Sequence, residues 1–205
     1  SSARAFCKTR EGLEAAIREV KSYAEICRHF QARFVRIFGG AIGDTPREQA
    51  IDVMAGNLQE MLAAVSGFPV QLLIETHDDW IDSRHLATVL KKVTSDSVGV
   101  LWDTHHPYRT IGETPIETWQ ALGKWIRNTH WKDSYVKRDT KRGYQLCLVG
   151  DGDIPLQDMF ACLKNNDYDG YLTLEWEKMW CPEIEEPEIA FPGYIQHMRE
   201  LIRQA

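Results

Sequence analysis

VGVLWDTHHPY, the stretch from Val98 to Tyr108, joins an unbroken apolar run to a group of ionisable side chains that begins at Asp103. An apolar run of this kind is typical of a strand buried on both faces of a parallel sheet. Similar runs occupy residues 34–38, 70–74, 125–131 and 171–174. The sequence therefore predicts five parallel strands.

Segments with the period of a helix separate these runs. Apolar residues recur at helical spacing over residues 11–30, 48–66 and 86–93, and further helices are expected from Thr114, after Pro155 and over 195–202. The alternation of strand and helix, with no linker, predicts a single α/β domain over residues 1–205. Five strands suit either an open doubly wound sheet or part of a (β/α)₈ barrel.

Composition limits the possible partners. The chain has 205 residues, with 24 Lys and Arg against 30 Asp and Glu, so it is large enough for one core and offers no basic surface for nucleic acid. Its apolar runs are too short to cross a bilayer, and we expect a soluble, cytoplasmic protein with no membrane partner. The 5 cysteines are widely spaced and form no CxxC pair, which indicates reduced thiols.

Four ionisable residues follow predicted strands directly. They are Glu75, Asp103, His130 and Glu175. Each alone is compatible with a solvated loop, a cap or a satisfied histidine. Because the carboxyl ends of parallel strands lie at one edge of a sheet, and converge on one axis in a barrel, the four together predict a site for one divalent ion. Three carboxylates and one imidazole suit Mn²⁺, Zn²⁺, Mg²⁺ or Co²⁺. This pattern favours the barrel.

The same residues belong to a larger set of motifs. The set comprises Asp103-x-x-His106, His130-x-Lys132-Asp133, the loop Gly150-Asp151-Gly152-Asp153 and the late Glu175. From about Phe34 onward the chain resembles the sugar phosphate isomerase/epimerase family, a group of xylose isomerase-like TIM barrels that also includes the AP endonuclease type.

The resemblance implies a (β/α)₈ TIM barrel in which Glu75, Asp103, His130 and Glu175 bind one divalent metal. It further implies that Glu75 and Glu175 act as the acid/base pair. The visible strands would correspond to the fourth to eighth of the barrel, with Ser1 to Phe6 as the end of the third. The expected domain is thus an N-terminally incomplete barrel that lacks its first two or three βα units. Its exposed edges would favour a homo-oligomer.

The expected reaction is isomerisation or epimerisation of a small sugar or sugar phosphate. It requires proton transfer at a carbon beside a carbonyl, through an enediolate whose charge a metal stabilises. A dehydratase or lyase acting on a polyol or keto acid would use the same site. The AP endonuclease alternative is disfavoured, because residues 143–148 lack the Asp-x-His that would supply further zinc ligands. A binding module without catalysis is the remaining alternative.

Several neighbours have weaker assignments. His106, Lys132 and Arg138 are candidates for binding substrate, with Lys132 and Arg138 suited to a phosphate or hydroxyl. The alternatives are a loop histidine for His106, an ion pair for Lys132 and a solvated loop for Arg138.

Other residues near the predicted strand ends are expected to be structural. His77 and His105 should be exposed, while Trp102 and Trp131 should pack against helices. The backbone N–H groups of Gly150 and Gly152 would either bind an anion or form a tight turn.

Overall fold

The computed structural model describes residues 1–204. Its main sheet has five parallel strands in the order β1-β2-β3-β4-β7. The strands are β1 (Phe34–Ile37), β2 (Gln71–Glu75), β3 (Val98–Asp103), β4 (Ile126–Trp131) and β7 (Tyr171–Leu174). All five predicted strands are confirmed. The order never reverses, whereas a doubly wound sheet reverses its order at a switch point, so the sheet is of the barrel type.

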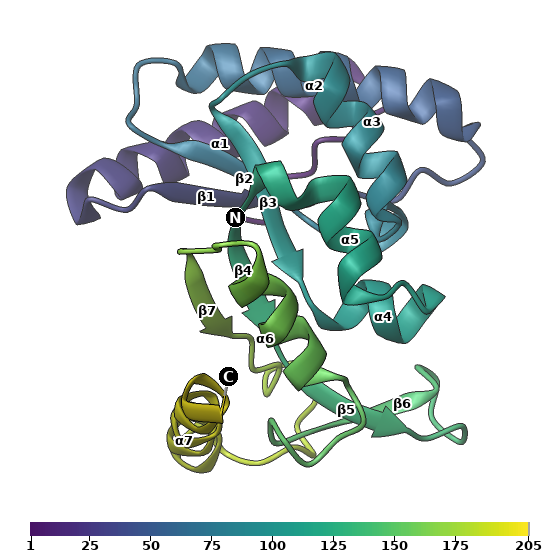
Figure 1. Cartoon of the computed structure of the whole chain (residues 1–205). Helices are drawn as coiled ribbons and strands as arrows, with labels where there is room; N and C mark the ends of the chain where they lie inside the picture. The colour runs from purple at the N-terminus through teal and green to yellow at the C-terminus, as the bar shows by residue number, and fades with distance from the viewer. Residues whose placement is uncertain (205) are drawn as a thin grey trace.

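Helices cover the outer face of this sheet (Figure 1). These helices are α1 (Arg10–Phe30), α2 (Arg47–Val65), α3 (Ser83–Val93), α5 (Pro115–Leu122) and α6 (Leu156–Asn165). Two further helices, α4 (His105–Ile111) and α7 (Pro187–Gln204), lie toward the carboxyl ends of the strands, and short 3₁₀ turns span Asp78–Trp80 and Gly123–Trp125. Contacts run from α1 to α2, α2 to α3, α3 to α5 and α5 to α6, which makes one continuous layer. Among the helices of residues 1–204, none combines the length and apolar composition of a membrane span.

Strand residues alternate between two faces. Val100, Trp102 and Trp131 belong to the core between sheet and helices, and the two tryptophans are buried as predicted. The opposite parity places Asp103 and His130 on the inner face, paired in register across β3 and β4. Alternation along buried strands thus separates packing residues from ionisable ones.

The first residues of the chain run beside β1. Ala5 donates its backbone N–H to the Phe38 carbonyl at 2.8 Å, and Phe38 donates to the Ala3 carbonyl at 2.9 Å. The bridge between Arg4 and Phe38 is parallel. The segment therefore behaves as the end of a strand next to β1, as predicted for Ser1 to Phe6.

The sequence analysis missed α4 and an antiparallel hairpin formed by β5 (Asp133–Val136) and β6 (Tyr144–Cys147). The basic run 137–142, predicted to be a solvated loop, forms the turn of this hairpin, with Lys137 N donating to the Gly143 carbonyl at 2.9 Å. The apolar residues of the helix predicted over 195–202, which is part of α7, do not all face the core. Met198 and Leu201 are buried, while Ile195 and Ile202 are exposed.

Candidate metal centre

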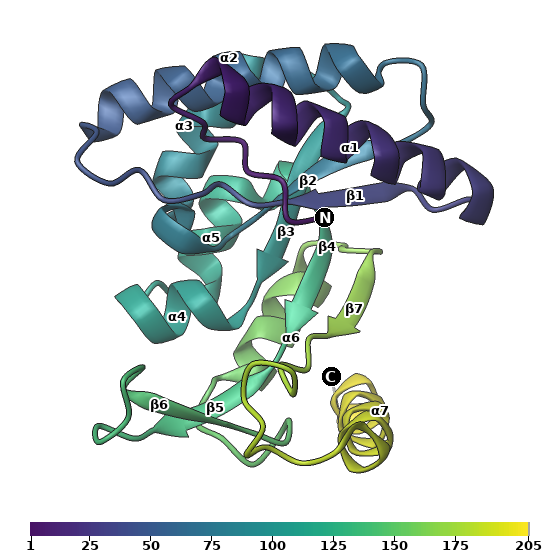
Figure 2. The same ribbon diagram turned by 180° about the vertical axis from the view of Figure 1, so that it is seen from behind.

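Four side chains from four strand ends meet on the inner side of the sheet. Each of Glu75, Asp103, His130 and Glu175 offers one ligand atom, and these atoms lie within 4.8 Å of one another. Figures 1 and 2 show the arrowheads of β3, β4 and β7 pointing toward the same end of the molecule. The predicted convergence is present, because parallel strands of one sheet bring their carboxyl ends to one edge.

Glu75 is buried and held from two sides. The guanidinium of Arg36 donates to Glu75 Oε2 at 2.8 Å, and His130 Nδ1 lies 2.9 Å from Glu75 Oε1. Arg36 comes from β1, and its guanidinium lies over the Phe38 ring, 4.1 Å from the ring centroid. Sequence analysis missed Arg36, although a single charged residue in the run Phe34 to Phe38 was a usable signal for an inward-facing partner.

Asp103 is buried at the point where β3 turns into α4. Its Oδ1 accepts the backbone N–H groups of His105 and His106, both at 2.9 Å. The other oxygen, Oδ2, lies 2.9 Å from the Lys132 ammonium. Two backbone bonds therefore fix the carboxylate and leave one buried oxygen directed at a cation.

His130 lies between two carboxylates. Its Nδ1 is 2.9 Å from Glu75 Oε1 and 3.3 Å from Glu175 Oε1. Burial opposes a charge on His130, yet hydrogen bonds to Glu175 and Glu75 raise its pKa to about 9. Burial likewise opposes ionisation of Glu175, but His130 and the Lys132 charge lower its pKa to about 2. The carboxylates of the cluster therefore stabilise a positive charge placed between them, as the carboxylates of a cation site must do.

Lys132 lies on the same side of the sheet as the four converging residues, and its side chain is 2% exposed. Its ammonium forms ion pairs with Asp103, Glu175 and Glu177 and lies 3.0 Å from His106 Nε2. The two alternatives for Lys132 were substrate binding and an ion pair, and the structure shows the ion pair. Burial lowers the pKa of Lys132, but the surrounding carboxylates raise it well above its ordinary value.

The two other candidates for substrate binding differ in position. His106 lies at the cluster, beside Lys132. Arg138 is exposed in the hairpin turn, and no hydrogen bond or ion pair in residues 1–204 joins it to the four converging residues. Instead Arg142 donates to Glu177 Oε2 at 3.0 Å. The sequence alone does not distinguish Arg138 from Arg142, because the register of the hairpin decides which side chain points toward Glu177.

The expectation that His105 is exposed is wrong. His105 is buried, and its Nε2 lies 2.8 Å from Ser134 Oγ. The reason is α4, which begins at His105 and turns this side chain toward β5. His77 is half-buried, with Nδ1 2.9 Å from Asp78 Oδ1.

The glycine loop encloses a carboxylate of the chain itself. Asp133 accepts the backbone N–H groups of Gly150 at 2.9 Å and Gly152 at 3.0 Å, and also those of Ser134 and Ile154. Burial raises the pKa of Asp133 against these hydrogen bonds. The loop is a tight turn, in which Asp151 N donates to the Leu148 carbonyl at 3.0 Å, and the anionic group that its N–H groups bind is the Asp133 carboxylate.

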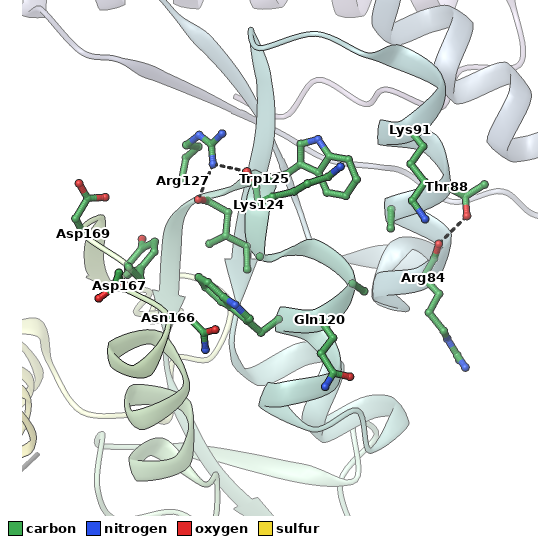
Figure 3. Close-up of a pocket in the computed structure, with 16 residues that line it drawn as sticks. Arg84, Thr88, Lys91, Gln120, Lys124, Trp125, Arg127, Asn166, Asp167 and Asp169 are labelled. Atoms are coloured by element: carbon green, nitrogen blue, oxygen red, sulfur yellow. Dashed lines mark hydrogen bonds between the residues drawn. The ribbon is translucent and has the colours of Figure 1, made fainter.

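A large hollow lies at the other ends of the strands (Figure 3). Its volume is about 870 Å³, and its walls include Trp125 and Ile126 at the start of β4 and Asp167 to Asp169 before β7. The metal-ligand candidates follow the opposite, carboxyl ends of these strands. The hollow is therefore separate from the candidate centre.

Comparison with known proteins matches residues 5–201 to the family model described as "Xylose isomerase-like TIM barrel". An inosose dehydratase of Clostridium botulinum (strain Eklund 17B / Type B) is 30% identical over 129 residues, which cover 56% of this chain and 41% of that protein. Uncharacterized protein YihM of Escherichia coli (strain K12) is 23% identical over 151 residues, covering 73% and 44%. The chain thus spans less than half the length of these curated relatives.

Solved structures agree on the fold. IOLI protein with a zinc atom superposes with a TM-score of 0.81 at 18% identity, covering 98% of this chain and 74% of that one. A D-tagatose 3-epimerase-like protein gives a TM-score of 0.79 at 17% identity, covering 99% and 74%. Together with the family match over nearly the whole chain, these findings confirm the predicted fold, and the chain belongs to the xylose isomerase-like TIM barrel family.

Proposed function

We propose that this chain carries the centre of a divalent-metal-dependent isomerase or epimerase acting on a small sugar or sugar phosphate. The observation that carries the proposal is the convergence of Glu75, Asp103, His130 and Glu175, whose ligand atoms lie within 4.8 Å of one another. The donor set fits an ion, since three carboxylates and one imidazole from four strand ends gather in the buried interior of the cluster. Mn²⁺, Zn²⁺, Mg²⁺ and Co²⁺ all accept such ligands.

The bound ion would supply Lewis-acid stabilisation of negative charge on neighbouring substrate oxygens. Glu175 lies beside His130 and Lys132, whose charges keep it ionised, and it is the carboxylate that would accept a proton from a substrate carbon. Glu75, fixed by Arg36, is the second carboxylate of the proposed acid/base pair. Return of the proton to the same carbon from the other face inverts it, whereas return to the adjacent carbon interconverts aldose and ketose.

His106 remains our candidate for binding a substrate oxygen, because it lies at the cluster and 3.0 Å from Lys132. For Lys132 we favour a role inside the cluster over one in binding phosphate. Its ammonium is already directed at the carboxylates of Asp103, Glu175 and Glu177. We propose no role in substrate binding for Arg138, since the hairpin turn that contains it is exposed and separate from the cluster.

A dehydratase is the second candidate function, and the similarity to inosose dehydratase over 129 residues favours it. The first step is the same, namely removal of a proton from a carbon beside a carbonyl. Loss of hydroxide from the next carbon would then replace return of the proton. Both reactions therefore require the same metal centre and the same basic carboxylate.

The test combines metal analysis with solvent exchange. The protein should bind one divalent ion and catalyse incorporation of deuterium from D₂O at carbon in keto-sugars, phosphorylated or not, or in cyclic polyol ketones. Release of water with formation of a new double bond would identify the dehydratase. Glu175→Gln should abolish exchange and weaken metal binding with little loss of fold, whereas the exposed Glu188→Gln should change neither. Full exchange activity in Glu175→Gln would remove the assignment.

A further inference from the structure

The Lys132 ammonium has the surroundings of a bound metal ion. Asp103 Oδ2 lies 2.9 Å from Nζ, Glu177 Oε1 lies 3.0 Å away, His106 Nε2 lies 3.0 Å away, and Glu175 Oε2 also contacts it. Three carboxylates and one imidazole thus surround a cation that is 2% exposed. This is the same donor set, in kind and number, as that of the candidate metal centre beside it.

Two of these donors are fixed by contacts that do not involve Lys132. Two backbone N–H groups hold Asp103, as described above, and Arg142 holds Glu177 through its other oxygen at 3.0 Å. The ligand atoms of His106, Glu175 and Glu177 lie within 4.8 Å of one another, a spacing that allows a shared ion. Asp103 and Glu177 would therefore keep contacts that hold their carboxylates in place if the ammonium were removed.

Two of the donors are common to both cation positions. Asp103 and Glu175 belong to the metal-ligand candidates and also contact Lys132. Carboxylates that bridge two cations are the usual framework of two-metal sites, in which the ions lie about 3.5–4 Å apart. The Lys132 ammonium thus shares two carboxylates with the candidate metal centre, as a second metal ion would.

We propose that Lys132 is a built-in second cation, which restricts the centre to one metal ion, and that its removal opens a second metal site formed by Asp103, His106, Glu175 and Glu177. This inference rests on the metal centre of the proposed function. The charges are consistent with it. Glu75, Asp103, Glu175 and Glu177 face the cations Arg36, Lys132 and Arg142, so loss of Lys132 increases the negative excess around the vacated position. A divalent cation is the charge that such a site attracts.

The experiment measures metal stoichiometry. Metal-depleted protein is titrated with Zn²⁺ and, separately, with Mn²⁺, and bound ions are counted after gel filtration. The wild type should bind one equivalent and Lys132→Ala two, with Mn²⁺ in the variant giving the magnetically coupled spectrum of an ion pair. Lys132→Arg, which keeps the charge, should bind one. Adding Glu177→Gln to Lys132→Ala should return the count to one.

The outcomes separate this inference from the proposed function. One equivalent in both the wild type and Lys132→Ala would overturn the inference and leave the proposed function intact. Two equivalents in the wild type would also overturn it. A wild type that binds no ion would remove the proposed function as well. If Lys132→Ala fails to fold in the absence of metal, Lys132→Ser, which keeps a small polar group in the same space, provides the same comparison.

Discussion

Arg36 of β1 donates to Glu75 of β2 across neighbouring parallel strands, with 2.8 Å between guanidinium nitrogen and carboxylate oxygen. The Glu75 side chain is 0% exposed, whereas that of Arg36 is 34% exposed. The partly exposed arginine therefore places its positive charge against a fully buried carboxylate. This contact fixes one oxygen of Glu75 and turns the other toward His130.

The first prediction concerns this pair. Arg36→Gln should reduce turnover about tenfold to hundredfold, because losing a hydrogen bond between charged groups costs about 1.5–3 kcal/mol. Metal stoichiometry should not change, since Arg36 contacts no atom of the ion's other ligands. Steady-state kinetics and metal analysis check both parts. Arg36→Lys, which keeps the charge and loses the planar fork, should recover part of the activity. Equal kinetics in all three proteins would show that Arg36 does not position Glu75.

The second prediction concerns the loop that encloses Asp133. A Cβ added at Gly152 would lie 2.1 Å from Asp133 Oδ1, so Gly152→Ala must displace the carboxylate from its backbone donors. We expect a loss of about 2–4 kcal/mol in the free energy of unfolding, because the displaced carboxylate is buried. Urea denaturation measures it.

Gly56→Ala is the matched control, because a Cβ there meets nothing within 4 Å. Gly56 lies inside α2, where alanine is favoured over glycine by up to about 1 kcal/mol, so this variant should be slightly more stable. Equal stability of the two variants would contradict the proposed role of the Asp133 loop.

The fold was accessible from sequence because its strands form short apolar runs, of which β3 is buried throughout. Runs such as Val98 to Trp102 are recognisable without any knowledge of their partners, and in four of the five strands an ionisable residue marks the carboxyl end. The four converging residues follow from that rule alone. Their metal-binding role is a chemical inference that metal analysis must test.

The missed features depend on contacts distant in sequence. The hairpin of β5 and β6 exists because Asp133 pairs with Cys147, and this register selects Arg142 over Arg138 as the partner of Glu177. The burial of His105 depends likewise on Ser134, 29 residues away. Local patterns contain no information about such pairings, so the residues around the predicted site were less predictable than the site itself.

The third prediction is a pH dependence at the start of α3. Asp82 caps this helix, since its Oδ1 accepts the Arg84 backbone N–H at 3.0 Å. Hydrogen bonds from the Arg84 side chain lower the pKa of Asp82, against the effect of burial. Because the folded-state pKa lies below the unfolded one, this stabilisation is complete above the unfolded pKa and is lost as the pH falls through the folded one.

Asp82→Ala should therefore cost about 1 kcal/mol of unfolding free energy near neutral pH, and the difference from the wild type should shrink as the solution is acidified below about pH 4. Asp82→Asn, which keeps a capping oxygen, should lose less at neutral pH and show a flatter acid limb. Denaturation curves at a series of pH values supply the comparison. A constant difference between Asp82→Ala and the wild type at every pH would exclude the ionised cap as its source.

The last prediction links metal binding to stability. A ligand that binds only the folded state stabilises it by about 2.7 kcal/mol when its free concentration is 100 times the dissociation constant. Here the unfolded chain cannot reproduce the site, because its ligands come from positions as far apart in sequence as Glu75 and Glu175. Zn²⁺ or Mn²⁺ should therefore raise the melting temperature of metal-depleted protein, and a chelator should reverse the rise. Asp103→Asn should abolish most of the effect, since it removes the negative charge of a buried carboxylate among the four proposed ligands. Asp158→Asn on α6, outside the cluster, is the control and should respond like the wild type. An equal rise in all three proteins would mean that the ion stabilises the chain from another position, and the four converging residues would lose their assigned role.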